Sequence, residues 1–338
     1  MTHMTFAAID EEQPGRKWQA RWRHSWPAYR AWLSTRRLKE PSPAVCLAAL
    51  QQHMPQLVQT YDKLLTLSEG WELEACFLSH WQPPEYLAGC SIAAKASHGL
   101  VRLVRNYDLS PELNEGLLLK SHWRKPVMGM VEFLWGLSDG INGDGLCAAI
   151  AYGGRRDTGA GFGITLIVRY ILEMCATVEE ALKVLERIPS HMAYNVTLAD
   201  RSGKTASVEL QPGGGLRHAW PSIATNHQNG PEQVVGHRFT ETHDRRAYLQ
   251  SLMADNPRPD EMAQAFLRPP LFQRRYEEGF GTLFTAEYDP CKPGVTLHWP
   301  SKNWPQSFAR FREHHDKVTY NAHTRTKPDG TQRALGKA

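Results

Sequence analysis

The order of patterns along this 338-residue chain predicts an α+β fold. Over residues 15–80, apolar residues recur at three- and four-residue intervals, which is typical of amphipathic helices. From Cys90 onward the pattern changes to strands, then to two helices, and then back to strands. Because strands and helices come in blocks and do not alternate regularly, stacked layers of sheet and helix are favoured over a doubly wound parallel sheet.

The composition is typical of a soluble globular protein, with 41% hydrophobic residues, 22% charged residues and a small net charge of +4. Lys and Arg are denser near both ends but form no concentrated stripe, so we expect no nucleic-acid partner. No apolar run approaches the roughly 18 residues of a membrane span, and the N-terminus lacks a secretory signal. The six scattered cysteines contain no CxxC pair and suit a reducing compartment, so we expect a cytoplasmic protein without a membrane partner.

The first 89 residues are predicted to form a helical segment. Trp26–Leu33 and residues 44–67 carry the clearest helical spacing. Two prolines, Pro83 and Pro84, then end the pattern, because proline lacks a backbone donor and disfavours helix in the residue before it.

Strands and helices alternate in blocks after this break. The expected turns are His98-Gly99, a second turn at Asn142, and Asp200–Gly203. Thr177 and Glu180 form a capping-box signature at a helix start. The expected elements are a strand pair over 90–107, a second pair over 138–152, helices over 163–175 and 177–188, a hairpin over 194–210, and strands over 282–288 and 295–299. Residues 321–338 are expected to be a disordered basic tail.

Cys90 lies where the proline-broken segment meets the first of these strands, between Gly89 and Ser91. A cysteine at such a position is ordinarily a small buried apolar residue. A thiol with a pKa of about 8.5 is only partly ionised at neutral pH. An α-amine on the same residue, with a pKa of about 8, could accept the thiol proton if no residue preceded the cysteine.

Six short motifs follow one another along the chain: Gly89-Cys90-Ser91, Arg105-Asn106-Tyr107-Asp108, Asp139-Gly-Ile-Asn142, the Asp200–Gly203 hairpin, Thr225-Asn226-His227 and Gly281–Asp289. Together they resemble the penicillin acyltransferase and choloylglycine hydrolase superfamily, the cysteine branch of the N-terminal-nucleophile hydrolases. Each motif is short, but all follow the family's order across residues 80–300. The resemblance implies a four-layer αββα sandwich, in which two antiparallel sheets lie between helical layers.

The resemblance also implies a mechanism and its residues. Self-cleavage between Gly89 and Cys90 would expose Cys90 as an N-terminal nucleophile, leaving residues 1–89 docked on a catalytic core of residues 90–320. Asp108 would hold the α-amine, and Arg105 would favour the thiolate. Asn226 would donate to the oxyanion. The alternatives are a surface ion pair for Arg105 and Asp108, and a turn residue for Asn226.

Two parts of the family's site are not matched clearly. We expect Asn142 to be only a turn residue. The choloylglycine hydrolases have a second oxyanion asparagine ten residues after the position that matches Asn142. This chain has Tyr152 there, followed by Gly153, whose backbone N–H is the candidate substitute. The family's late arginine has three candidates, Arg238, Arg245 and Arg246, of which Arg246 is favoured.

Other patterns support different functions less well. Gly159, Gly161 and Gly163 resemble a phosphate loop but lack the spacing of a dinucleotide site, so we expect a loop that borders the substrate pocket. Fifteen histidines include no HExxH motif, and neither a metal nor another cofactor is expected. A papain-like dyad of Cys90 with His227, which needs no cleavage, is an alternative.

The sequence therefore predicts a self-processing cysteine amidohydrolase that cleaves linear N-acyl or peptide-like amide bonds through a Cys90 thioester. Its partners would be a small amide or acyl substrate and its own cleaved N-terminal segment. One alternative is an acyl-CoA-dependent N-acyltransferase. Another is a non-catalytic, unprocessed binding protein with the same fold.

Overall fold

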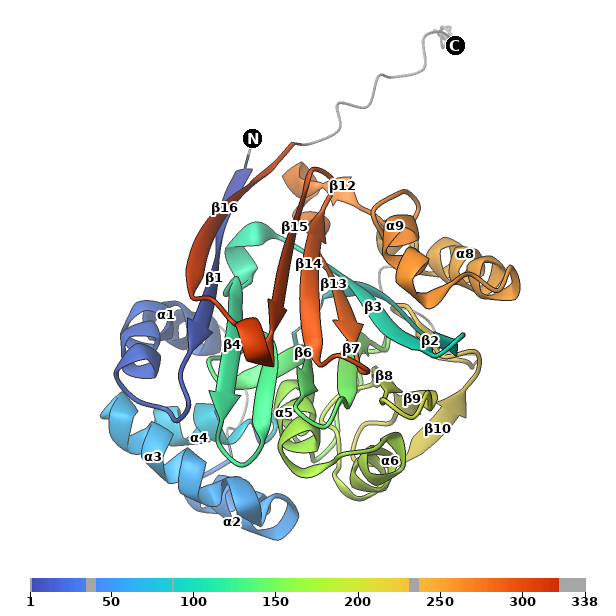
Figure 1. Cartoon of the computed structure of the whole chain (residues 1–338). Coiled ribbons are helices and arrows are strands. Elements are labelled where there is room, and N and C mark those ends of the chain that lie inside the picture. The colour runs from blue at the N-terminus through green and yellow to red at the C-terminus, as the bar shows by residue number, and fades with distance from the viewer. Residues whose placement is uncertain (1, 35–40, 87, 231–236, 322–338) are drawn as a thin grey trace, which may run out of the picture.

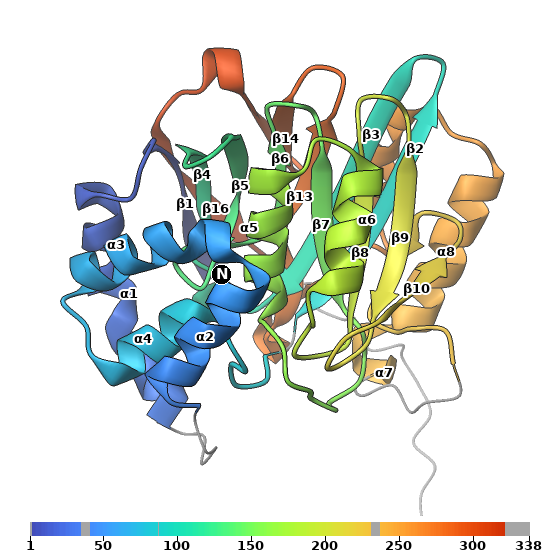
Figure 2. The ribbon, with the colours of Figure 1, turned by 90° about the horizontal axis from the view of Figure 1, so that it is seen from below.

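The computed structural model describes residues 2–34, 41–86, 88–230 and 237–321. Two β-sheets lie face to face, and helices cover the outer face of each sheet (Figures 1 and 2). The order of the layers is therefore helix, sheet, sheet, helix, which confirms the expected four-layer αββα architecture. The tail expected over residues 321–338 lies outside the described residues except for Asn321.

The larger sheet has nine described strands in the spatial order β10-β9-β8-β7-β6-β5-β4-β1-β16. All neighbours are antiparallel except β1 and β4, so the expectation of purely antiparallel sheets is wrong at this pairing. A parallel pair needs a long crossover, and the N-terminal helices form part of it. The strands are β1 Thr2–Asp10, β4 Leu117–His122, β5 Pro126–Glu132, β6 Gly136–Asn142, β7 Cys147–Tyr152, β8 Tyr194–Ala199, β9 Thr205–Leu210, β10 Leu216–Ala219 and β16 His314–Tyr320.

The smaller sheet has the order β11-β2-β3-β13-β14-β15, and β12 pairs with β13 outside this path. Its central strands, β3 and β13, bring the first hairpin of the core beside the late strands that the sequence predicts. The strands are β2 Gly89–Ser97, β3 Leu100–Leu109, β11 Ile223–Ala224, β12 Arg274–Arg275, β13 Phe280–Asp289, β14 Gly294–Trp299 and β15 Lys302–Ser307.

The helices form the two outer layers. Four N-terminal helices occupy the region where helical spacing predicts them: α1 Arg16–Ser34, α2 Pro43–His53, α3 Val58–Ser68 and α4 Glu72–Ser79. With them, α5 Ile164–Met174 and α6 Val178–Arg187 cover the larger sheet, whereas α8 Thr242–Ala254 and α9 Met262–Phe266 cover the smaller one (Figure 2). The short α7 spans His237–Thr240. Within the described part of the chain, no helix has the length and apolar character needed to cross a bilayer.

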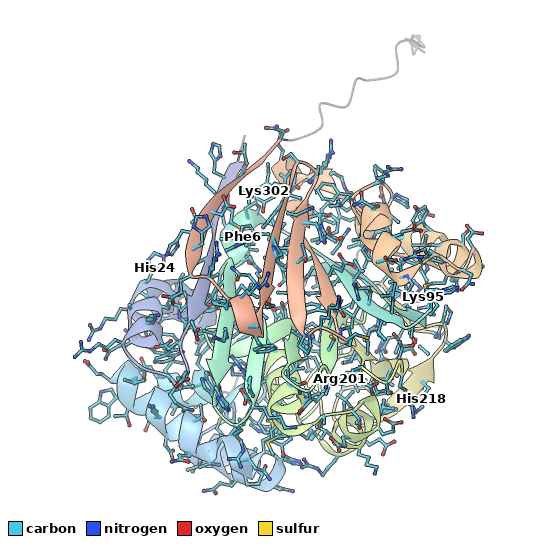
Figure 3. The ribbon with its side chains drawn as sticks, in the orientation of Figure 1. Phe6, His24, Lys95, Arg201, His218 and Lys302 are labelled. Atoms are coloured by element: carbon cyan, nitrogen blue, oxygen red, sulfur yellow. The ribbon has the colours of Figure 1, made fainter. Side chains whose placement is uncertain are left out.

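The sequence predicts a helical segment over residues 1–89, and this is wrong at its start, because the segment begins with strand β1. This strand lies between β4 and β16 in the larger sheet (Figure 1). Its Met4, Phe6 and Ala8 are buried. Phe6 is labelled in Figure 3. Its ring lies 5.9 Å from that of Phe284 and 5.1 Å from that of Trp299. Both neighbouring strands are more than 100 residues away in sequence, so no local turn signal identifies β1.

The hairpin of β2 and β3 sets the positions of the site residues. His98 and Gly99 form its two-residue turn with φ values of 53° and 72°, the left-handed geometry of tight hairpin turns. The turn fixes the register, which pairs Cys90 with Tyr107 and Gly89 with Asp108. The expected strand pair over residues 90–107 is therefore present.

Candidate active site

Cys90 lies at the start of β2 and is buried, with 1% of its surface exposed. Its sulfur accepts a 3.2 Å hydrogen bond from Nη2 of Arg105 on the neighbouring strand. Burial raises the pKa of the Cys90 thiol to about 11, because the charged form is poorly solvated, although Arg105 favours the thiolate. In this uncut chain the thiol is therefore protonated at neutral pH.

Arg105 is fully buried, and residues of the larger sheet bind the guanidinium nitrogen that does not contact the thiol. Its Nη1 donates to Oγ of Ser138 at 3.0 Å and to the carboxylate of Asp139. The hydroxyl of Tyr288 donates to the other Asp139 oxygen at 2.7 Å. Burial lowers the pKa of Arg105, but the charges of Cys90 and Asp139 outweigh this effect and raise the pKa overall. The guanidinium therefore stays charged and fixed beside the sulfur.

Asp108 lies opposite Gly89 in the hairpin, at the bond that self-cleavage would break. One of its oxygens accepts a 2.7 Å hydrogen bond from the hydroxyl of Thr282, and the other lies 3.5 Å from Nη1 of Arg245. Burial raises the pKa of Asp108, and Arg245 and Thr282 partly offset this rise. The Cys90 N–H donates to Asn226 instead of Asp108, so the expected hydrogen bond from an α-amine to Asp108 stays a prediction.

The structure brings Arg245, and not the favoured Arg246, to Cys90. The fully buried Arg245 guanidinium donates to the backbone oxygen of Cys90 at 2.5 Å and to Oγ of Ser91 at 2.9 Å. Arg246 instead donates to Oδ1 of Asn229 at 3.1 Å. Adjacent residues of a helix point about 100° apart, so one of the two faces the site and the other turns away. The third candidate, Arg238, has a side chain outside the described part of the chain.

Asn226 binds the backbone on both sides of Gly89. Its Oδ1 accepts the Cys90 N–H at 2.9 Å and Nη2 of Arg245 at 2.7 Å. Its Nδ2 donates to the backbone oxygen of Ala88 at 3.1 Å and to that of Tyr152 at 3.4 Å. The amide nitrogen thus binds the carbonyl oxygens of Ala88 and Tyr152, and its role as an oxyanion donor stays a prediction.

The second oxyanion donor is not found where the sequence places it. The Gly153 N–H donates to the backbone oxygen of Ala193 at 2.8 Å, so it is already used in the sheet and cannot be the substitute expected from the sequence. Tyr152 supplies only a carbonyl acceptor to Asn226. Asn142 is a turn residue as expected, because its Oδ1 accepts the N–H groups of Asp144 and Leu146.

His227 does not act on Cys90 in this arrangement. Its Nδ1 lies 2.8 Å from the hydroxyl of Thr242 and 3.2 Å from that of Thr225. Burial and the charge of Arg246 lower the pKa of His227 to about 3. Among the described contacts none joins His227 to the thiol, which disfavours a papain-like dyad.

A cavity of about 370 Å³ lies between the N-terminal segment and the core. Aromatic residues form much of its wall, including Trp32, Phe77 and Tyr86 from the N-terminal segment and Phe133 from the core. Tyr86 precedes Cys90 by four residues, so the chain that leads to the candidate cleavage bond forms part of the wall.

The glycine-rich loop borders the same cavity through Gly159 and Gly163, and its place beside a substrate stays a prediction. A Cβ on Gly159 would lie 2.3 Å from the backbone nitrogen of Gly213, and one on Gly161 would lie 2.4 Å from the backbone carbon of Ser190. These glycines therefore allow close backbone packing and leave no phosphate cradle at these two positions.

Several residues that bind Arg105, Asp108 or Asp139 were not assigned a role from the sequence. Asp139 and Thr282 lie within the motifs that carry the family resemblance, so a signal for them was present. Tyr288 also lies within Gly281–Asp289, but at a position that the resemblance does not specify, and Ser138 directly precedes the Asp139 motif. The stacking of the two sheets brings Ser138 to Arg105 and Tyr288 to Asp139.

Comparisons with known proteins point to one family. A sequence model described as "Acyl-coenzyme A:6-aminopenicillanic acid acyl-transferase" matches residues 95–304, more than half of the chain. A search of curated protein sequences finds no match.

Solved structures with a similar chain path include three enzymes. Penicillin V acylase from Agrobacterium tumefaciens has 16% identity and a TM-score of 0.41, with 65% of this chain and 86% of that chain covered. A mutant of the conjugated bile acid hydrolase from Clostridium perfringens has 13% identity and a TM-score of 0.45, covering 69% and 97%. The Caenorhabditis elegans orthologue of N-acylethanolamine-hydrolyzing acid amidase has 15% identity and a TM-score of 0.42, covering 60% and 93%.

Proposed function

Because the chain belongs to the acyl-coenzyme A:6-aminopenicillanic acid acyl-transferase family, we propose that it is a self-processing cysteine enzyme acting on linear amide bonds through Cys90. The observation that carries the proposal is the 3.2 Å contact between the Cys90 sulfur and the buried Arg105. A guanidinium at this distance stabilises a thiolate, and the two sheets fix it there through Asp139.

Self-cleavage is the first step of the proposal. The Cys90 sulfur attacks the carbonyl carbon of Gly89, the C–N bond breaks, and the nitrogen takes the thiol proton. Water then hydrolyses the resulting thioester, which frees the thiol and leaves an α-amine on Cys90. The hydrogen bonds of Asn226 and Arg245 to the Cys90 backbone support this step, because they hold the reacting peptide still.

Turnover uses the same atoms. The new α-amine accepts the thiol proton, and the thiolate attacks the carbonyl carbon of the substrate. Nδ2 of Asn226, which binds the Ala88 oxygen in the uncut chain, would then be free to bind the substrate oxyanion. The amine passes its proton to the leaving nitrogen, and water releases the acyl group from the thioester.

The cavity supports a substrate with an apolar acyl group. Its volume is about 370 Å³, and its aromatic wall offers few charged partners. Cys90 is not among the residues that line this cavity, but Tyr86, four residues before it, is. Acyl transfer from an acyl-CoA to an amine is the second candidate, because the family description names that donor.

Intact-mass spectrometry of the purified protein tests the proposal. The wild-type chain of 38.3 kDa should give two fragments that separate between Gly89 and Cys90, and Cys90→Ala should stay whole. Cys147→Ala is the matched control, because Cys147 is also fully buried but has no described hydrogen bond to Arg105, Asn226 or Arg245. A wild-type chain that remains whole and resists thiol acylation would support the non-catalytic binding protein instead.

A further inference from the structure

A buried carboxyl group, Glu132, lies at the end of β5 and takes no part in the mechanism above. Its Oε1 accepts a hydrogen bond from the hydroxyl of Tyr107 on β3. Its Oε2 is buried and has no hydrogen-bond partner among the described residues. Burying a carboxylate with one unpaired oxygen costs free energy, so Glu132 is a candidate for a functional role.

Tyr107 connects Glu132 to the proposed nucleophile. The Arg105 guanidinium carbon lies 4.3 Å from the centroid of the Tyr107 ring, as in a cation–π contact. The same ring stacks on Phe284 with 5.6 Å between centroids and 3° between planes. Arg105 is in turn bonded to the Cys90 sulfur. Three contacts therefore lead from the carboxyl group to the thiol.

The backbone that carries Glu132 is held in an unusual turn. Phe133 and Leu134, which follow it, have φ values of 57° and 69°, a region that non-glycine residues adopt at a cost. The Leu134 N–H donates to Oε1 of Glu115 at 2.8 Å, which helps to keep the turn in this form. The turn fixes the point from which the Glu132 side chain reaches Tyr107.

We propose that Glu132 is a positioning residue, which holds Tyr107 under Arg105 and so keeps the guanidinium against the Cys90 sulfur. The proposal rests on the proposed function, because it takes Cys90 as the nucleophile. Ionised Glu132 accepts a stronger, charge-assisted hydrogen bond from Tyr107 than protonated Glu132 does. The reactivity of Cys90 therefore follows the charge of Glu132.

The surroundings make this charge sensitive to pH near neutrality. Burial raises the pKa of Glu132 to about 7, and Tyr107 and Arg105 oppose the rise. The ionisable groups near Glu132 come from six segments of the chain. They are Arg105 and Tyr107 of β3, Glu115 before β4, Asp139 of β6, Tyr29 of α1, Tyr86 between α4 and β2, and Tyr194 of β8. Below about pH 7 the carboxyl group takes up a proton.

The test measures alkylation of Cys90 by iodoacetamide as a function of pH, with the site read by peptide mass spectrometry. Glu132→Gln keeps an oxygen that can accept from Tyr107 but cannot ionise. In wild type, the logarithm of the rate should fall more steeply below pH 7 than in Glu132→Gln, by up to one decade per pH unit. Tyr107→Phe should lower the rate at pH 8 by about tenfold or more.

Tyr61→Phe is the matched control, because Tyr61 is also buried and donates a 3.1 Å hydrogen bond, to the backbone oxygen of Ala75 in the N-terminal segment. It should keep the wild-type rate and pH profile. Equal profiles in wild type and Glu132→Gln, or equal losses in Tyr107→Phe and Tyr61→Phe, would overturn the proposal. Self-cleavage that persists in Cys90→Ala would instead overturn the proposed function, so the two failures are distinguishable.

Discussion

The backbone N–H of Cys90 donates a 2.9 Å hydrogen bond to Oδ1 of Asn226, which lies 136 residues further along the chain. Arg245 donates to the same oxygen, whereas two backbone carbonyl oxygens accept from Nδ2. Donors on one side and acceptors on the other fix the orientation of the amide. Its nitrogen is therefore the end that faces carbonyl oxygens, and in the proposed mechanism it would bind that of the substrate.

Replacing Asn226 tests this assignment. Asn226→Ala should lower turnover of an amide substrate by about 10²–10³-fold, because it removes an oxyanion donor. Asn229→Ala is the control, since Asn229 binds Glu209 and Arg246 instead of the Cys90 backbone. Steady-state kinetics of both variants, purified in cleaved form, gives the comparison; equal turnover would exclude Asn226 as a donor.

The two neighbouring arginines should differ sharply in stability. Arg245→Met removes the partner of the buried Asp108 and should lower the free energy of unfolding by about 3–5 kcal/mol. Arg246→Met loses a hydrogen bond to Asn229 and should cost about 1 kcal/mol. Urea unfolding of both variants measures the difference. A larger loss for Arg246→Met would show that Arg246 is the more important residue.

A methyl group at Gly89 should slow self-cleavage. A Cβ there would lie 2.4 Å from the ring of Phe280 and 2.9 Å from Cβ of Asp108, so the peptide before Cys90 would be displaced. Gly89→Ala should accumulate uncut chain, with cleavage slower by about tenfold or more. The double variant Gly89→Ala/Phe280→Ala relieves the contact and should recover part of the rate, followed by gel electrophoresis over time. Unchanged cleavage in Gly89→Ala would contradict this view.

The pH dependence of the thiol should change when the chain is cut. In uncut Gly89→Ala, the rate of Cys90 alkylation should rise about tenfold per pH unit between pH 7 and 10, because the thiol pKa is about 11. In the cut wild type, a protonated α-amine beside the sulfur favours the thiolate and lowers its pKa. The midpoint should therefore move to lower pH after cleavage. Identical midpoints in the two forms would rule out the amine as the partner of the thiol.

The local part of the site follows from the sequence. Cys90, Arg105 and Asp108 lie on two strands joined by a two-residue turn, so their spacing alone brings them together. Asn226 has no such local constraint, and only its place in an ordered series of motifs identified it. The sequence therefore predicts best those contacts that one hairpin determines.

Contacts between distant segments could not be predicted in the same way. The choice between Arg245 and Arg246 depends on how α8 packs against the smaller sheet, which helical periodicity does not determine. The use of the Gly153 N–H depends on the pairing of β7 with β8. Glu132 depends on the stacking of the two sheets, because Tyr107 belongs to one sheet and Glu132 to the other.

Strand β1 has a consequence for how this protein can be made. It occupies an interior place in the larger sheet, with β4 on one side and β16 on the other. A polypeptide that started at Cys90 would leave a nine-residue gap there, expose two rows of unpaired backbone groups, and uncover the contacts of Phe6. Synthesis as one continuous chain avoids this problem, because β1 then pairs with its two neighbours before the proposed self-cleavage.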